Sequence, residues 1–511
     1  MNYFITLKAA LAFIEGSLRS GVDTDTVARH TGFSPSHFHT VFRAALGMPP
    51  AAYIRSRRLM HAAKDLAESE DRVVDVALRY GFDSHETFTR AFVRQFKKTP
   101  SEFRAGCRRF PIPIVSPGIF GPTLNYKEET MSDQNKGIER FEDGTVLHGV
   151  PRVSYFGNPP ELTPFIASLK TAMQYIGYTD IPYAHYHCMA GSAFRLMWNT
   201  SCWDGGNIDI LVTDENPVEP LLRAVKAGGR SCRMLFKHTA NETHFHGRLQ
   251  PGPGVEYGGK DDFITLIKGQ IDSGIPVIVF GVMGPPEACV VTGYRENGEA
   301  LLGWNFFQDM PDMVGAVEKT VEGTFIRREW YEHSETIGAV AIGGCAGMAP
   351  LRENVREALG YAVRIMLPRR VGAYAGGLDA FDAWASALSK KSEFPANAPM
   401  PLLFERLMCQ SDAHTMVAEG RSYAKGWLEY MAQQIPEASD PMLKAAKLFD
   451  HSHRTVWEMW DIIGGIGMGE KQAGNIGDDH IRQKLIERIG KLRQYDEKAI
   501  PHLRRAFELL E

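Results

Sequence analysis

Cysteine is sparse in this sequence, and long hydrophobic runs are missing. The 511 residues include seven cysteines, none of which forms a C-x-x-C pair with another. This spacing argues against a disulfide-rich scaffold and a zinc finger and is typical of a reducing compartment, so we expect a cytoplasmic protein. No stretch of about 18 consecutive apolar residues is present, and we therefore expect neither a transmembrane helix nor a membrane partner.

Excess positive charge is confined to the N-terminal region. The formal net charge of the whole chain is -4, yet residues 1–110 contain 17 lysines and arginines against 11 aspartates and glutamates, a net charge of +6. The remaining residues therefore carry a net charge of -10. A basic head on an acidic body indicates that only the head contacts a polyanion.

Hydrophobic periodicity divides the chain into regions of different secondary structure. The predicted regions are an all-α domain (1–109), a Pro- and Gly-rich linker (110–137), an α+β domain (138–346) and an all-α region (347–511). Within the α+β domain, short β-rich stretches predict strands at 207–212, 276–282, 288–294 and 323–330. The expected fold class is therefore multidomain.

The N-terminal domain contains an internal repeat. VARHTGF (27–33) recurs as VALRYGF (76–82), an offset of 49 residues. The match continues at an offset of 50 with the pairs Phe38/Phe88, Phe42/Phe92, Pro50/Pro100 and Tyr53/Phe103. Two copies of one helical unit, joined by a long helix at about Ala51–Glu68, form a specific architecture.

Each copy has the parts of a helix-turn-helix. A short helix is followed by a glycine, Gly32 or Gly81, where a tight turn requires a positive φ. Ser34-Pro35 and Asp83-Ser84 then supply helix-capping chemistry. The second helix of each copy, roughly 35–46 and 85–96, is the one expected to enter the major groove of DNA.

The stretch 53–104, YIRSRRLMHAAKDLAESEDRVVDVALRYGFDSHETFTRAFVRQFKKTPSEFR, resembles the AraC/XylS family of bacterial transcription regulators, in its Rob/MarA-like branch. The resemblance implies double-stranded DNA as a partner and, as the usual outcome, activation through contact with RNA polymerase. By position, the base-facing residues are Ser36, His39, Thr40 and Arg43 in the first recognition helix and His85, Glu86, Thr87 and Arg90 in the second.

Arg90 is the strongest candidate for base readout because its guanidinium can bond guanine in a bidentate manner. Arg55 and Arg57, on the connecting helix, are candidates for phosphate contacts. Ser36, His39 and Thr40 depart from the bulkier groups of better-known relatives, so the operator sequence does not follow from the resemblance.

Two stretches of the α+β domain, 186–198 and 287–308, resemble papain-like cysteine peptidases and acyltransferases. The resemblance implies a nucleophilic Cys188 at a helix N-terminus and Asn305 as an orienting group. Glu287 stands where such enzymes carry histidine, and a carboxylate raises the pKa of a nearby thiol instead of lowering it. His185 and His187 adjoin Cys188 too closely to substitute easily. We therefore expect a catalytically degenerate pocket that senses a ligand.

Aromatic residues and carboxylates suggest what such a pocket would bind. The candidate ligand-binding residues are Trp198, Trp203, Asp204, Glu287, Trp304 and Phe306. Aromatic walls with carboxylates suit a flat or cationic organic molecule, although tryptophans at this spacing are more often part of a core. Three histidines (His238, His244 and His246) lack a visible fourth ligand, so we expect no metal and no cofactor. GGIGMG (464–469) lies in a helical region and is predicted to be a loop.

The sequence thus predicts a ligand-responsive DNA-binding regulator with a small-molecule effector and a homodimeric assembly. One alternative is a cysteine-dependent amidase or acyltransferase tethered to a DNA-binding head. Another is a constitutive DNA-binding protein whose C-terminal body is purely structural. A reactive Cys188 would favour the enzyme over the regulator. Stabilisation of the protein by a small molecule would favour the ligand-responsive regulator over the constitutive DNA-binding protein.

Overall fold

The computed structural model describes the chain in several stretches. These are residues 49–106 except 70, 83 and 97; residues 136–511 except 154, 156–159, 309–316, 333, 334 and 468; and, before residue 49, residues 10, 13, 14, 16–19, 22–31, 38 and 42. The predicted linker 110–137 lies outside the described residues except for its last two. The chain divides into two compact units, one assigned residues 1–126 and 465–469 and the other residues 127–464 and 470–511.

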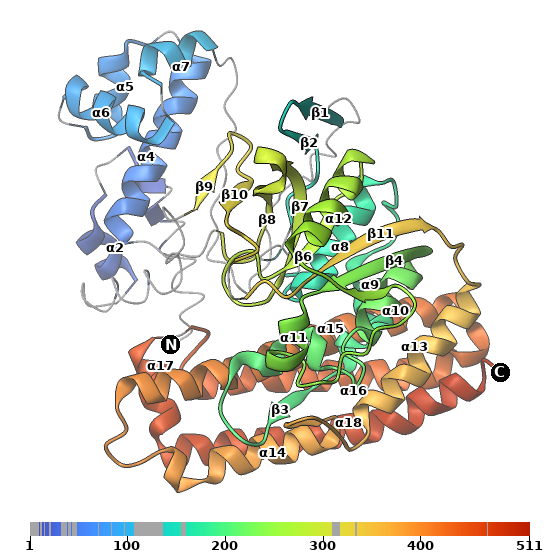
Figure 1. Ribbon diagram of the computed structural model, residues 1–511. Coiled ribbons are helices and arrows are strands. Elements are labelled where there is room, and N and C mark those ends of the chain that lie inside the picture. The colour runs from blue at the N-terminus through green and yellow to red at the C-terminus, as the bar shows by residue number, and fades with distance from the viewer. Residues whose placement is uncertain are drawn as a thin grey trace. The chain divides into compact units, whose positions relative to one another are not determined.

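The first unit is helical. Its described helices are α2 (Thr24–His30), α4 (Pro50–Glu68), α5 (Val73–Arg79), α6 (His85–Phe96) and α7 (Pro100–Gly106). The long helix α4 follows Pro49 and has Pro50 in its first turn, where a missing N–H costs no hydrogen bond. As Figure 1 shows, α4 connects the part of the unit that contains α2 with the part that contains α5, α6 and α7.

Aromatic packing within the first unit confirms the sequence repeat. The rings of Phe38 and Phe42 lie 5.2 Å apart, and their counterparts Phe88 and Phe92 lie 5.3 Å apart. Phe42 meets Tyr53 at 5.4 Å, and Phe92 meets Phe103 at the same distance. Each lobe therefore has its own small aromatic core.

The second unit contains a large, mostly antiparallel sheet. Its strands run in the order β5-β4-β11-β6-β7-β8-β10-β9, and the hairpin β1–β2 joins β7 from the side. The bounds are β1 (Gly137–Phe141), β2 (Gly144–His148), β4 (Arg230–Phe236), β5 (Val255–Tyr257), β6 (Val277–Phe280), β7 (Ala288–Arg295), β8 (Ala300–Trp304), β9 (Glu318–Lys319), β10 (Phe325–Arg328) and β11 (Gly338–Cys345). Three of the four predicted strands are confirmed as β6, β7 and β10.

Helices cover both faces of this sheet. On one face α12 (Lys260–Asp272) packs Phe263 and Ile267 against Val279 and Val291. The shorter helices of the unit are α8 (Pro164–Tyr175), α9 (Tyr183–Met189), α10 (Glu219–Ala227) and α11 (His238–Thr243). On the opposite face, residues of α8 and α9 pack against Ile278 and Val290. Alternating side chains along each strand therefore enter two different cores.

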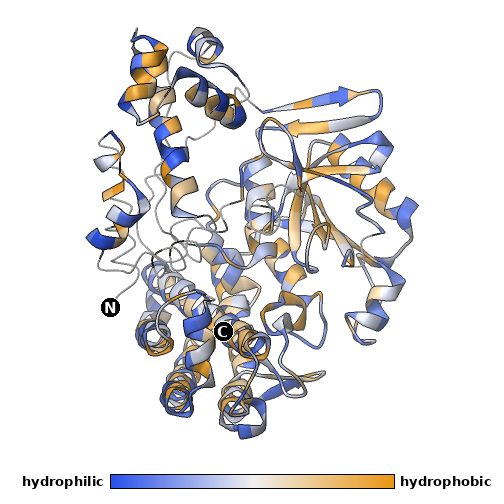
Figure 2. Ribbon diagram, turned by 90° about the vertical axis from the view of Figure 1, so that its left-hand side faces the viewer, coloured by the Kyte–Doolittle hydropathy of each residue, from blue (hydrophilic) through white to orange (hydrophobic). Residues whose placement is uncertain are grey.

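The C-terminal helices share a core with the sheet. They are α13 (Leu351–Met366), α14 (Leu378–Ser389), α15 (Met400–Gln434), α16 (Ser439–Ile463), α17 (Glu470–Gly477) and α18 (Asp479–Glu508). Leu428, Phe449 and Leu503 from this set belong to the same buried cluster as Phe165 and Val290. In Figure 2 these helices show hydrophobic and hydrophilic residues side by side, whereas the strands are largely hydrophobic. The expected boundary at 346/347 therefore does not separate two compact units.

Local structure differs from the expectation in two further places. The predicted strand 207–212 instead forms two short 3-10 turns, η3 (Gly205–Ile208) and η4 (Ile210–Val212), because Asp209 caps η4 by accepting from the Leu211 amide at 2.9 Å. The C-terminal region also contains strand β13 (Tyr374–Gly376), which pairs with β3 (Met197–Asn199) on one side and with β12 (Arg369–Val371) on the other.

The loop prediction for GGIGMG is confirmed at its boundaries. Helix α16 ends at Ile463, and α17 begins at Glu470. Gly464 has a φ of 105°, which ends α16 in a left-handed conformation. No helix among the described residues is long and apolar enough to cross a membrane.

His148 joins the hairpin β1–β2 to the loop before β10. Its Nε2 lies 2.8 Å from Glu139 Oε2 and its Nδ1 lies 3.0 Å from Glu322 Oε1. Burial lowers the pKa of His148, but the carboxylates of Glu322 and Glu139 outweigh burial, and the net pKa lies above its ordinary value. The protonated imidazole therefore holds the hairpin more firmly than the neutral one.

Because the folded-state pKa of His148 is raised, its stabilising effect is present below the unfolded pKa and disappears as pH rises through the folded pKa. We expect His148→Gln to destabilise the protein by less than about 1 kcal/mol at acidic pH, since the partners are exposed, and by still less at alkaline pH. Thermal unfolding at about pH 5.5 and about pH 8.5 measures this. A deficit that grows with pH would contradict the assignment.

Candidate nucleic-acid interface

Helix α6 is introduced by a tight turn and a side-chain cap. Gly81 has a φ of 73°, the left-handed conformation predicted for it. Ser84 Oγ then accepts a hydrogen bond from the Thr87 amide at 3.1 Å and donates to Thr87 Oγ1 at 3.0 Å. The turn and the cap fix the start of α6, which is the end that enters the groove in helix-turn-helix proteins.

The two faces of α6 differ sharply. Phe88 and Phe92 are fully buried and anchor the helix to its lobe. The predicted base-facing residues His85, Glu86, Thr87 and Arg90 are all exposed on the other face. Among the described residues, Arg90 has no ion-pair or hydrogen-bond partner. Arg94, which the sequence analysis did not select, is exposed one turn later, and its spacing of four residues from Arg90 could have revealed it.

The two arginines predicted to contact phosphate have different environments. Arg55 is exposed on α4 and remains available. Arg57 is only 1% exposed, and its Nη1 lies 3.4 Å from Met60 Sδ. The prediction for Arg57 is therefore wrong, because residues two apart on a helix point to nearly opposite sides. Arg58 instead ties the lobes together by donating to the Val22 carbonyl at 2.8 Å and lying beside Gly81.

A polar network fixes the spacing of the two lobes. Asp65, on α4, accepts hydrogen bonds from Arg79 Nη1 at 2.7 Å and from the Tyr80 hydroxyl at 3.0 Å, both from the second lobe. Arg19, before α2, donates to the same Asp65 carboxylate at 3.2 Å and to the Tyr80 hydroxyl at 3.1 Å. Residues of both lobes thus converge on one carboxylate of the connecting helix, which holds the lobes in register.

The recognition residues predicted for the first lobe, Ser36, His39, Thr40 and Arg43, lie outside the described residues, as do Gly32 and the Ser34-Pro35 cap. Phe38 and Phe42, which flank those positions, are buried like their counterparts Phe88 and Phe92. The predicted pattern of inward aromatic residues is therefore present in both copies.

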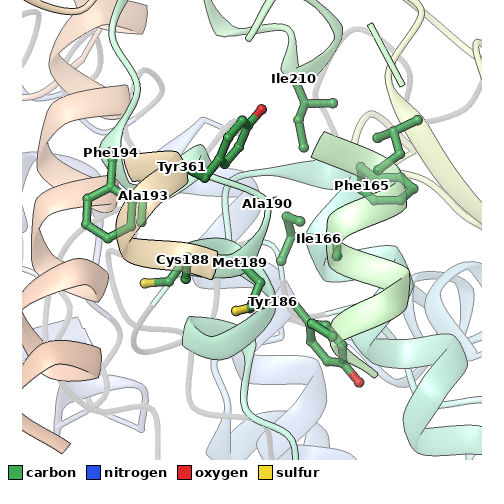
Figure 3. Close-up of a cluster of buried hydrophobic side chains, with 14 of the residues drawn as sticks. Phe165, Ile166, Tyr186, Cys188, Met189, Ala190, Ala193, Phe194, Ile210 and Tyr361 are labelled. Atoms are coloured by element: carbon green, nitrogen blue, oxygen red, sulfur yellow. The ribbon is translucent and has the colours of Figure 1, made fainter. Parts of the chain in front are cut away.

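Cys188 is not placed as a nucleophile. It lies in the last turn of α9, not at a helix N-terminus, and its exposure is 0%. Figure 3 shows its neighbours in the chain, Tyr186 and Met189, and Phe194 among the same buried hydrophobic side chains. Burial raises the pKa of the Cys188 thiol well above its ordinary value. The expectation of a nucleophilic cysteine at a helix start is therefore wrong.

The burial of Cys188 predicts slow alkylation. In the native protein at about pH 8, we expect iodoacetamide to modify Cys188 at least about a hundredfold more slowly than the exposed Cys345. Mass spectrometry of peptides after timed quenching measures both sites in one sample. Equal rates would show that Cys188 is an accessible thiolate and would restore the enzyme alternative.

The other predicted catalytic groups are also not assembled. His187 is buried, and both its ring nitrogens lack hydrogen-bond partners among the described residues. Burial lowers the pKa of His187 well below its ordinary value and that of His185 to about 4, so neither supplies a charged imidazolium. Asn305 accepts from the Phe307 amide at 2.7 Å and stabilises a turn instead of orienting a histidine.

The predicted ligand-binding residues fall into two groups. Trp198 and Trp203 meet edge to face at 5.2 Å, and Trp198 also stacks on Trp384 at 5.9 Å. Phe306 contacts Tyr155 at 5.1 Å in a separate group. Trp198 and Trp304 are 3% and 7% exposed, so both contribute to the core.

The two predicted carboxylates, Asp204 and Glu287, interact with carboxylates that the sequence did not single out. Glu287, just before β7, interacts electrostatically with Asp209 and Asp412, and Asp412 interacts with Asp204. Asp412, on α15, was not predicted from the sequence. It comes near Asp204 only because the C-terminal helices pack against the loop after β3.

The three histidines considered for zinc do not share a strand. His238 begins α11 and stacks on Tyr257, whereas His244 Nε2 lies 2.9 Å from Asp209 Oδ2. His246 is exposed. Within the part of the chain that the structure describes, no three histidine, cysteine, aspartate or glutamate residues are close enough to hold a metal ion.

Comparison with known proteins gives a consistent result for the first unit. Residues 27–106 match the family described as "Helix-turn-helix domain". The chain is 40% identical over 94 residues to "HTH-type transcriptional activator AarP" of Providencia stuartii, a match that covers 18% of this chain and 70% of that protein. It is 36% identical over 110 residues to "Uncharacterized HTH-type transcriptional regulator YbfP" of Bacillus subtilis, covering 22% of this chain and 37% of that protein.

A third relative is "Transcriptional regulator Rob" of Salmonella typhimurium, 40% identical over 98 residues, with 19% of this chain and 34% of that protein covered. The match thus spans only about a third of the length of YbfP and Rob. Rob-like proteins were expected among the relatives of the N-terminal domain, and that expectation is confirmed.

Proposed function

This chain belongs to the AraC-type helix-turn-helix transcription regulators, and we propose that it binds double-stranded DNA through the exposed face of α6 and the equivalent helix of the first lobe. The observation that carries the proposal is the two-sided character of α6, with phenylalanines buried on one side and His85, Glu86, Thr87 and Arg90 exposed on the other. A helix of this kind matches the dimensions of the major groove.

In vitro selection from random duplexes tests this proposal with the full-length chain. We expect one sequence element to be enriched, with an affinity about 10³-fold or more above that for unrelated DNA at the same salt concentration. Enrichment of no sequence would overturn the proposal. Arg55 and Arg94 would add phosphate contacts, so binding weakens as salt increases.

We further infer that the second unit senses a small-molecule effector and that the protein acts in the bacterial cytoplasm as an activator. Its partners would be RNA polymerase and a second copy of the chain. The resemblance of 186–198 and 287–308 to papain-like enzymes supports a papain-derived fold for this unit. The buried Cys188 and the neutral His185 and His187 favour sensing over catalysis. A change in DNA affinity or in transcription on adding an effector would require different affinities of that effector for two states of the protein.

A further inference from the structure

The two lobes of the first unit are attached to different parts of the connecting helix. The beginning of α4 contributes Tyr53 and Ile54 to the core of the first lobe, and the remainder contributes Leu59 and Leu66 to the core of the second. Apolar packing of this kind is not directional, whereas hydrogen bonds are. The helix therefore fixes the distance between the lobes, and their rotation about α4 depends on hydrogen bonds that join one lobe to the other.

Arg58 makes the first contact between the lobes. Its Nη2 donates to the Val22 carbonyl of the first lobe at 2.8 Å. The same guanidinium lies against the second lobe, because a Cβ built on Gly81 would lie 3.5 Å from Arg58 Cζ and Nη1. One side chain of α4 thus contacts the segment that leads into α2 and the turn that precedes α6.

Asp65 anchors a second contact. Its carboxylate accepts from Arg19 Nη2 of the first lobe at 3.2 Å and from the Tyr80 hydroxyl of the second lobe at 3.0 Å. Arg19 Nη2 also donates to the Tyr80 hydroxyl at 3.1 Å, and the Arg19 guanidinium lies 5.5 Å from the centre of the Tyr80 ring. A hydrogen bond therefore runs directly from one lobe to the other, beside the bonds to α4.

The two contacts lie on one side of α4. Arg58 and Asp65 are seven residues apart, so at about 3.6 residues per turn they face the same way, with about 10 Å between them along the helix axis. Two anchors at that separation resist rotation of one lobe against the other, which a single anchor does not.

Both contacts lead into the aromatic cores of the lobes. Val22 belongs to the same buried cluster as Phe38 and Phe42, and Tyr80 belongs to the same buried cluster as Phe88 and Phe92. Close-packed interiors transmit displacements instead of absorbing them. Loss of the two contacts would therefore let α6 turn relative to the core of the first lobe.

Duplex DNA converts such a rotation into a change of preferred spacing. One turn of B-DNA contains about 10–10.5 base pairs, so one inserted base pair moves a downstream half-site by about 3.4 Å and rotates it by about 34°. Two lobes held in one relative orientation engage two half-sites together at one spacing only. Two lobes that rotate against each other tolerate several spacings.

We propose that Arg58 and Asp65 are positioning residues that set the spacing between two half-sites of the DNA element, one half-site being the bases read by each lobe. The inference rests on the proposed function, because it concerns the same DNA-binding surface. It adds a source of specificity that is separate from the side chains that contact bases.

Altered spacing tests the inference with the full-length chain. After selection from random duplexes, one base pair is inserted or removed between the two half-sites, and affinities are compared by competition at one salt concentration. We expect either change to weaken binding by about tenfold or more, because only one lobe then engages its half-site. A selected element with a single half-site, or unchanged affinity at the altered spacings, would overturn the inference.

The double variant Arg58→Met/Asp65→Asn removes both anchors. Methionine keeps a long side chain without N–H donors, and asparagine keeps the shape of the aspartate without its charge. We expect the cost of altered spacing to fall to about threefold or less, while the base preferences within each half-site stay as in wild type.

A matched control makes the same two chemical changes elsewhere in the head. Arg72 and Asp75 form an exposed ion pair at 2.8 Å within the second lobe alone. Arg72→Met/Asp75→Asn should therefore keep the full cost of altered spacing. Arg58→Lys, whose ammonium group can still donate to the Val22 carbonyl, should keep it as well.

Duplexes that contain only the second half-site separate orientation from folding. Arg79 keeps its ion pair with Asp71 when Asp65 is changed, so the second lobe of Arg58→Met/Asp65→Asn should bind this half-site as wild type does. Loss of that binding would show that the two residues maintain the fold of the lobe instead of its orientation, and would overturn the inference.

The outcomes distinguish this inference from the proposed function. Enrichment of no sequence would remove the DNA-binding proposal and this inference with it. Enrichment of two half-sites whose spacing stays equally strict in Arg58→Met/Asp65→Asn would refute the positioning role alone.

Discussion

Arg90→Ala weakens binding of the full-length chain to its selected DNA site by about 1–3 kcal/mol, a factor of roughly 5 to 150, and relaxes the preference at one base pair. The reason is geometric. Arg90 is exposed on α6 with no partner among the described residues, so its guanidinium is free to bond a guanine edge. Competitive binding against single-base variants of the site measures both effects.

A control in the same lobe distinguishes base readout from general loss of charge. Arg72 is exposed and pairs with Asp75 at 2.8 Å outside α6. Arg72→Ala removes the same charge and should change affinity by less than about 1 kcal/mol. Arg90 would be excluded from base readout if both variants weakened all DNA sequences equally.

Asp496→Ala destabilises the second unit by about 3–5 kcal/mol, because it leaves the Arg421 guanidinium charged and unpaired in the interior. The side chains of Arg421 and Asp496 are 1% and 2% exposed, and Arg421 Nη2 lies 2.5 Å from Asp496 Oδ2. Arg421 Nη1 also donates to the Ala193 carbonyl at 2.9 Å. The pair therefore ties α15 to α18 and to the turn after α9.

Tryptophan fluorescence during urea unfolding reports this effect selectively. All eight tryptophans lie at or beyond Trp198, in the second unit. Glu508→Ala removes an exposed partner of Arg505 and should cost less than about 1 kcal/mol. Equal unfolding midpoints for Asp496→Ala and Glu508→Ala would contradict a critical role for the buried pair.

The sequence predicted the first unit well because its signals are local. Matched aromatic positions and the glycine before α6 depend on a few neighbouring residues, and Phe88, Phe92 and Gly81 behave as expected. The error at Arg57 was avoidable, since helical geometry places Arg55 and Arg57 on opposite sides of α4.

The second unit was predicted less well because its determinants are non-local. A start of α9 at Tyr183, after Pro182, puts Cys188 at the wrong end of the helix for a nucleophile. The partnership of Asp412 with Asp204 arises only when α15 packs against a loop about two hundred residues earlier in the chain. Periodicity along the chain contains no information on such contacts.

The salt dependence of DNA binding tests the central claim most directly. The full-length chain is titrated onto its selected site and onto unrelated duplex across a range of salt concentrations. We predict that the logarithms of both affinities fall linearly with the logarithm of salt concentration, while the selected site keeps its advantage and Arg90→Ala reduces that advantage by a factor of roughly 5 to 150. Equal affinity for both duplexes at every salt concentration would contradict sequence-specific binding through α6.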